Sequence, residues 1–245
     1  MEFRLQPIID TMLELYQLPL NSDRFKEYLK ILQGDTQGDL DLPIGNFNPM
    51  VKEHVIDKLL ELKALNAENI MVATLNELNK KFSQNKMGAV FKVVLNLSDD
   101  LKGGWTNRYT TDYDTKFGSN ALIKRNFCAP IFWTSESFDV DIVRQRTLEF
   151  AYRTIYRIQF PKPTTLKSHI EQEKFIAQNL NLKSDLANFE FEKINKFYSE
   201  HTDSDNYSLI FNFMYGDEIS ESLAFPTYGV KTKMAGFEFS KSESN

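Results

Sequence analysis

The sequence has a single cysteine, Cys128, and no long run of apolar residues. One cysteine excludes an internal disulfide framework and is typical of proteins from a reducing compartment. No stretch approaches the roughly 18 uninterrupted apolar residues of a membrane-spanning helix. Charged residues interrupt the apolar ones near the N-terminus, unlike in a signal peptide. We therefore expect a soluble, cytoplasmic protein with no membrane partner.

Recognisable catalytic motifs are also missing. The sequence has neither the Gly-x-Ser-x-Gly elbow of serine hydrolases nor the HExxH motif of zinc proteases. Gly103–Gly104 lacks the Lys-Ser/Thr and the third spaced Gly of phosphate-cradling loops. Cys128 lies among apolar residues, a setting in which cysteines are inert. Whether the chain is an enzyme, and which cofactor it takes, therefore stays open.

The composition is otherwise that of a folded protein, with 42% apolar and 26% charged residues among 245. The net charge of −5 is unevenly spread, because residues 101–178 carry 12 Lys and Arg against 8 Asp and Glu. Duplex nucleic acid requires clustered cations, so an acidic chain predicts no nucleic-acid partner. The basic middle favours a small anionic ligand. The alternative is that this charge serves solubility alone.

Apolar periodicity predicts a helical first third. One amphipathic helix is expected to begin near Ile8 and to end before Pro19, and a second covers residues 22–32. Asn48–Pro49 then has the residues of a helix start. A short link near Asn66 joins that helix to the next one, so the two should form an antiparallel hairpin.

The period changes after residue 86. Strands are predicted over residues 89–97, within 121–133, and at 209–213 and 237–239. Helices are predicted over residues 140–158, 166–180 and 190–200. Because strands and helices do not alternate regularly, the pattern favours α+β over a doubly wound sheet.

We therefore predict a single α+β domain over residues 1–245. Residues 1–86 should form a helical layer packed on a small, mainly antiparallel sheet. That sheet and the additional helices should occupy residues 87–240. The last residues, 241–245, should fray.

Residues 98–120 connect the first two predicted strands over 23 residues, longer than an ordinary loop. Trp105 and Tyr109 offer stacking surfaces, and Asn107 and Arg108 lie between them. The Arg108 guanidinium can bind an anion. The segment 103–114 is therefore a candidate binding site. The alternative is a long twisted hairpin whose aromatic side chains pack on the sheet.

The predicted helix over 140–158 places its arginines on one face. At 100° per residue, Arg146, Arg153 and Arg157 fall with Glu149 within an arc of about 80°. If this stripe lines a cleft, its guanidiniums can hold a carboxylate or phosphate. The cleft interpretation predicts that Arg153→Ala loses anion binding at a nearly unchanged melting temperature. If the stripe faces water instead, Glu149 and Arg153 form a surface pair.

A metal site is the second functional hypothesis. His169 and Glu173 stand four residues apart on one helix face, and Glu149 is a candidate third ligand. Such a site would suit a metal-assisted hydrolase or transferase. The alternative is a helix-surface ion pair. A third class is an interaction protein without a ligand, in which aromatic residues and arginines serve packing. The favoured function is binding of a small anionic ligand or partner through the 103–114 segment and the arginine stripe.

Overall fold

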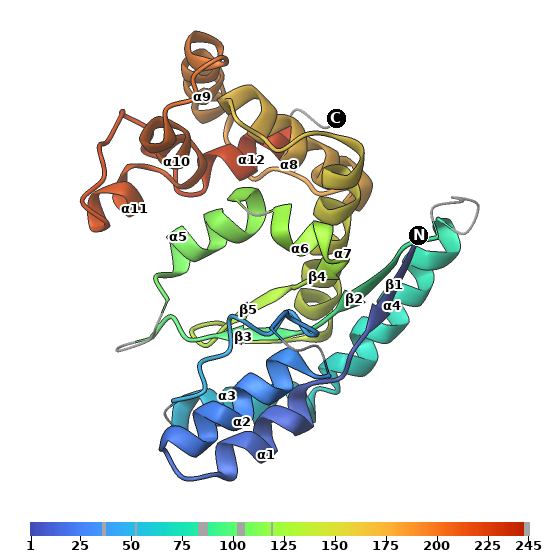
Figure 1. The fold of residues 1–245 in the computed structure, drawn as a ribbon. Coiled ribbons are helices and arrows are strands. Elements are labelled where there is room, and N and C mark those ends of the chain that lie inside the picture. Colours follow the sequence, from blue (N-terminus) through green and yellow to red (C-terminus); the bar gives the residue numbers. More distant parts are fainter. Residues whose placement is uncertain (36–37, 52, 83–87, 102–105, 119, 243–245) are drawn as a thin grey trace. The chain divides into compact units, whose positions relative to one another are not determined.

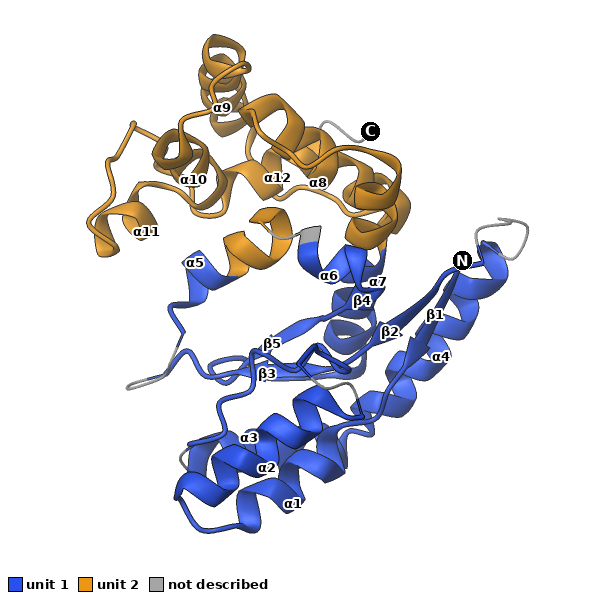
Figure 2. Cartoon of the chain, in the orientation of Figure 1, with its two compact units in different colours: residues 1–111, 120–151 blue, residues 112–119, 152–245 orange. Residues whose placement is uncertain are grey.

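A computed structural model describes the chain except residues 36–37, 52, 83–87, 102–105, 119 and 243–245 (Figure 1). The described part is rich in helix and contains a few short strands, which confirms the mixed class. Its contacts divide the chain into two compact units (Figure 2). Unit 1 comprises residues 1–111 and 120–151, and unit 2 comprises residues 112–119 and 152–245. That these form a single domain stays a prediction. Among the described helices, none combines the length and hydropathy needed to cross a bilayer.

Unit 1 is built on short parallel strands. β1 (Glu2–Leu5) pairs with β2 (Val90–Val93), and β2 pairs with β4 (Phe127–Cys128). Further along the same two chain segments, β3 (Asn96–Ser98) pairs with β5 (Ile131–Trp133). Each of these pairings in the described residues is parallel, so the predicted antiparallel sheet is wrong.

The parallel pairing explains the long connection after β3. Parallel neighbours need a crossover, usually helical, whereas a hairpin joins antiparallel strands. The crossover here contains α5 (Arg108–Tyr113), the π-helical turn η1 (Asp114–Gly118) and α6 (Asn120–Lys124). The hairpin alternative for residues 98–120 is therefore wrong.

The first third of the chain is mainly helical in its described residues. It contains α1 (Ile9–Gln17), α2 (Ser22–Gln33), α3 (Glu53–Ala64) and α4 (Ala67–Lys81). Figure 1 shows α1, α2 and α3 gathered on one side of the strands, with α4 alongside β1. α3 begins at Glu53, later than Asn48–Pro49 predicts. The Asn48 Oδ1 does accept a hydrogen bond from the Met50 amide at 2.8 Å, but the turn at residues 49–50 is not continued as helix at Val51.

β1 is a strand that periodicity misses, since it has only four residues of mixed polarity. The Asn79 side chain on α4 completes it. Its Nδ2 donates to the Phe3 carbonyl and its Oδ1 accepts from the Phe3 amide, both at 2.8 Å. This amide takes the place of a neighbouring strand and so covers an edge that could otherwise pair with another chain.

Unit 2 is helical in its described residues. It holds the end of α7 (Val140–Gln159) and all of the later helices: α8 (Leu166–Leu180), α9 (Asn188–His201), α10 (Tyr207–Tyr215), α11 (Asp217–Ser222) and α12 (Ala235–Ser242). The helices predicted over 140–158, 166–180 and 190–200 are confirmed as α7, α8 and α9. Lys241 and Ser242 belong to α12 rather than to a frayed tail, and residues 243–245 lie outside the described residues.

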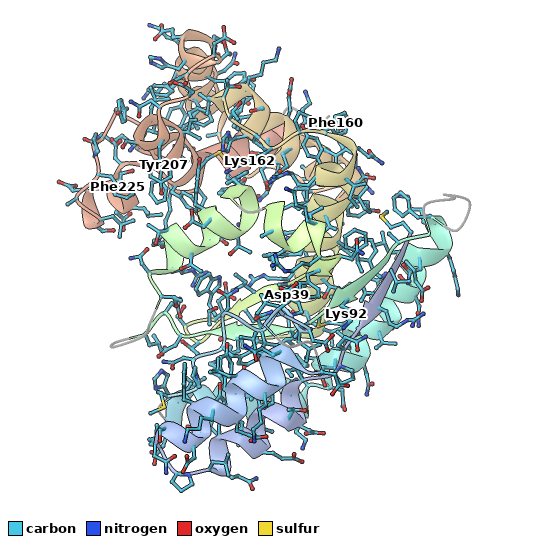
Figure 3. All side chains as sticks on the ribbon, in the orientation of Figure 1. Asp39, Lys92, Phe160, Lys162, Tyr207 and Phe225 are labelled. Atoms are coloured by element: carbon cyan, nitrogen blue, oxygen red, sulfur yellow. The ribbon has the colours of Figure 1, made fainter. Side chains whose placement is uncertain are left out.

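The strands predicted at 209–213 and 237–239 are wrong, because these residues lie in α10 and α12. Every residue of α10 from Leu209 onward is buried, and a helix buried on all sides shows no polar face. The ends are set locally, because the Asn206 Oδ1 accepts from the Leu209 amide at 3.0 Å and Gly216 has a φ of 93°. The exposed Tyr207, at the start of α10, meets the half-buried Phe225 edge to face with 5.9 Å between ring centroids (Figure 3).

Candidate functional site

Polar side chains gather in unit 1 where β3 and β5 end. Asp99 and Asp100 follow β3, and Thr134, Ser135 and Glu136 follow β5. Because the two strands are parallel, their carboxyl ends lie at the same edge, which is where open α/β sheets bind ligands. We call the following cluster the strand-end site: His54, Lys58, Asp99, Asp100, Arg108, Thr134, Ser135, Glu136 and Arg146.

The end of β5 positions both aspartates. The Thr134 Oγ1 lies 3.0 Å from the Asp99 Oδ1 and 3.1 Å from the Asp100 Oδ1. The Ser135 amide and hydroxyl donate to the two Asp100 oxygens at 2.9 and 2.6 Å. The Asp99 and Asp100 side chains are only 5% and 3% exposed. The site thus contains two buried carboxylates, those of Asp99 and Asp100.

Two arginines share one glutamate above these aspartates. The Arg108 Nη1 donates to the Asp100 Oδ2 at 3.2 Å, and its Nη2 donates to the Glu136 Oε1 at 2.6 Å. The Arg146 Nη1 donates to the Glu136 Oε2 at 2.6 Å. The Arg108 guanidinium also lies 5.6 Å from the centre of the Trp133 ring. The structure therefore brings together two of the predicted anion-binding residues, Arg108 and Arg146.

His54 belongs to the same site. Its Nε2 lies 2.9 Å from the Asp99 Oδ1, and its side chain is 32% exposed. The sequence alone gives His54 no role, because the adjacent pair Glu53–His54 does not indicate a catalytic or metal-binding motif. Asp99 and Glu136 are missed for a different reason. Acidic residues directly after strands indicate a site only once the strands are known to be parallel.

The other predicted contacts of the 103–114 segment have separate outcomes. Trp105 lies outside the described residues. The Asn107 Oδ1 accepts from the amides of Tyr109 and Thr110 at 3.1 and 3.2 Å, so Asn107 caps the start of α5. Tyr109 is half-buried in the first turn of that helix.

The remaining two arginines of the stripe belong to unit 2. The Arg153 Nε and Nη2 donate to the two carboxylate oxygens of Glu173 at 3.0 and 2.5 Å. Their side chains are 7% and 4% exposed, so Arg153 does not face water. The Arg157 Nη1 donates to the Phe117 carbonyl at 3.3 Å, and burial lowers the pKa of Arg157. The Glu149 Oε1 accepts from the Gln145 Nε2 at 2.8 Å.

The predicted metal ligands are engaged by other groups. The His169 Nδ1 lies 2.7 Å from the Thr165 carbonyl, and its Nε2 lies 3.0 Å from the Tyr113 hydroxyl. Burial lowers the pKa of His169. His169 and Glu173 lie in unit 2 and are buried, and Glu149 lies in unit 1. Among the described residues, no group of three or more His, Cys, Asp or Glu is arranged to hold a metal ion.

Comparisons of the chain with protein-family models, with curated proteins and with solved structures found no match. Function is therefore inferred from the strand-end site. It combines three carboxylates, those of Asp99, Asp100 and Glu136, with three cationic side chains. The cations are Lys58, Arg108 and Arg146. Such a site can hold a charged ligand group in a fixed orientation.

Proposed function

We propose that unit 1 binds a small molecule bearing a carboxylate or phosphate at the strand-end site, with Arg108 as the main anion contact. The observation that supports this is the order of exposure. The Arg108 side chain is 34% exposed, whereas that of Asp100 beneath it is 3% exposed. A guanidinium that neighbouring carboxylates already orient loses little side-chain entropy when it binds an anion.

The hydrogen bonds of the site favour an anion over a cation. The Asp100 oxygens already accept from the Ser135 amide and hydroxyl and from Arg108, so a cationic ligand would have to displace protein donors. Arg146, paired with the same Glu136, adds positive potential beside Arg108. Trp105 and Tyr109 remain proposed stacking surfaces for the rest of the ligand. The proposal leaves out Arg153 and Arg157, because both residues belong to unit 2.

The compartment that we propose is the cytoplasm. Cys128 is a buried free thiol, which suits a reducing environment.

Calorimetric titration with inorganic phosphate and with succinate tests the proposed function. Arg108→Gln removes charge-assisted hydrogen bonds worth about 1.5–3 kcal/mol, so we expect affinity to fall about 10-fold or more. Arg144→Gln is the matched control, because Arg144 pairs with Glu77 on an exposed surface of unit 1. It removes the same charge and should leave affinity unchanged. Equal losses in both variants, or no binding by the wild-type protein, would contradict the proposal.

A further inference from the structure

We infer that His54, oriented by Asp99, acts as a general base at the strand-end site. The base activates water for the hydrolysis of a carboxylic ester that also carries an anionic group. This inference rests on the proposed function, because Arg108 has to hold the anionic group. It adds an activity to what would otherwise be a binding site.

The geometry of the pair supports a basic imidazole. The His54 Nε2 lies 2.9 Å from the Asp99 Oδ1, so with its proton on Nε2 the ring donates to the carboxylate. The Asp99 Oδ1 also accepts from the Leu101 amide at 3.1 Å, which fixes the carboxylate. The lone pair of the neutral ring is then on Nδ1. Among the described residues, no hydrogen bond is made to that atom, and the side chain is 32% exposed.

The nucleophile that follows from these contacts is water. The nearby Ser135 hydroxyl donates to the Asp100 Oδ2 at 2.6 Å and accepts from the Arg108 Nη1 at 2.8 Å. It is therefore engaged by groups other than His54. Because the imidazole is partly exposed, a water molecule can reach Nδ1 from solvent.

The hydrogen bonds also link the base to the proposed anion contact. His54 contacts Asp99, and the Thr134 hydroxyl lies within 3.1 Å of both Asp99 and Asp100. Asp100 in turn accepts from Arg108. One connected network thus orients both the base and the cation. The inference requires a substrate that spans this network, with its carboxylate at Arg108 and its ester carbonyl at His54.

The reaction balances without a further reactant. The water oxygen forms a bond to the ester carbonyl carbon while its proton passes to the His54 Nδ1. The tetrahedral intermediate then breaks its bond to the alkoxy oxygen, which takes the proton from Nδ1. The products are a carboxylic acid and an alcohol, and no atom changes its oxidation state.

The test uses the full chain with 4-nitrophenyl hydrogen succinate as the anionic ester and 4-nitrophenyl butyrate as the neutral one. We expect kcat/KM to be higher for the anionic ester. His54→Gln should lower kcat by roughly 10²- to 10⁴-fold, the usual contribution of a general base. Asp99→Asn, which changes a positioning residue, should lower kcat at an unchanged KM, whereas Arg108→Gln should mainly raise KM. His201→Gln, in unit 2, is the control for hydrolysis by surface imidazole.

Two further readouts separate a base from a nucleophilic or structural histidine. A general base gives a solvent deuterium isotope effect on kcat and an inflection in the pH profile that His54→Gln abolishes. Equal turnover by the wild-type protein and His54→Gln, with succinate binding intact, would overturn this inference and leave the proposed function standing. If the wild-type protein does not bind succinate at all, the proposed function itself is contradicted.

Discussion

Both units contain an arginine–glutamate pair, but in opposite settings. In unit 1 the Arg108 guanidinium meets Glu136 with 34% of the arginine side chain exposed. In unit 2 Arg153 meets Glu173 with 7% and 4% of the two side chains exposed. A pair near water costs little to break, so a ligand can compete for its cation, whereas a buried pair is costly to break. The same two residue types thus form a partly exposed pair in one unit and a buried pair in the other, and the proposed binding role of Arg108 depends on that difference.

The largest expected effect comes from breaking the buried pair. Glu173→Ala leaves the Arg153 guanidinium buried without its carboxylate, which should lower the free energy of unfolding by about 3–5 kcal/mol. Urea unfolding monitored by circular dichroism measures this loss. Arg153→Ala should also destabilise the protein, contrary to the unchanged melting temperature that the cleft interpretation predicts.

The control for that experiment is the double substitution Arg153→Met with Glu173→Leu. Removing both charges should recover most of the stability, because neither partner is left unpaired. A loss below about 1 kcal/mol in Glu173→Ala, the range of surface pairs, would remove the contrast between the two units.

The second effect concerns another carboxylate of unit 2. The Asp217 Oδ1 accepts from the Asn212 side chain at 3.0 Å and from the amides of Tyr228, Gly229 and Val230 at 3.1–3.2 Å. Asp217→Ala removes the acceptor for three backbone amides, so we expect a loss of about 2–3 kcal/mol in urea unfolding. The exposed Asp203 supplies the control, because Asp203→Ala should change stability by less than about 0.5 kcal/mol.

The third prediction concerns pH. Burial alone raises the pKa of Asp112, but Lys116 and a hydrogen bond from Tyr215 outweigh burial and hold it below its usual range. Ionised Asp112 therefore stabilises the folded state above the ordinary carboxyl pKa, and this contribution is lost as pH falls through the lowered value. The urea midpoint of the wild-type protein should fall on acidification. Asp112→Asn should show a shallower fall, and an unchanged slope would refute the assignment.

Apart from the control substitutions, the smallest stability change is expected at the strand-end site. Arg108→Gln should lower the free energy of unfolding by less than about 1 kcal/mol, because the arginine is partly exposed and the buried Asp100 keeps its hydrogen bonds from Ser135. The same variant should show the largest loss of anion affinity. A loss of several kcal/mol in urea unfolding would make Arg108 a structural residue like Arg153.

Sequence patterns located much of the helical structure. α1 ends at Gln17, two residues before Pro19, as the proline predicts. α8 spans Leu166–Leu180, as its apolar spacing predicts. The same reasoning failed at α10, where an apolar run with buried residues on all sides has the same local signal as a strand. The sequence signals for a helix at this place were Asn206, which caps its start, and Gly216, which follows its end.

The candidate site was predicted only in part. Arg108 and Arg146 were selected from composition and helical spacing, and both contact Glu136. Arg153 and Arg157 lie on the same helical stripe but in unit 2. Helical periodicity gives the direction of a side chain around the helix axis. It does not give the elements that pack against that face of the helix, because those elements are distant in the sequence.

The positions of the amphipathic helices can be read from local sequence, because period, caps and prolines act over a few residues. The parallel direction of the strands is visible only in the folded chain, since pairing direction depends on a crossover between segments far apart in the sequence. That direction brings Asp99 and Glu136 to one edge. Burial likewise depends on the packing of the whole unit, and so the different environments of Arg108 and Arg153 arise only in the folded chain.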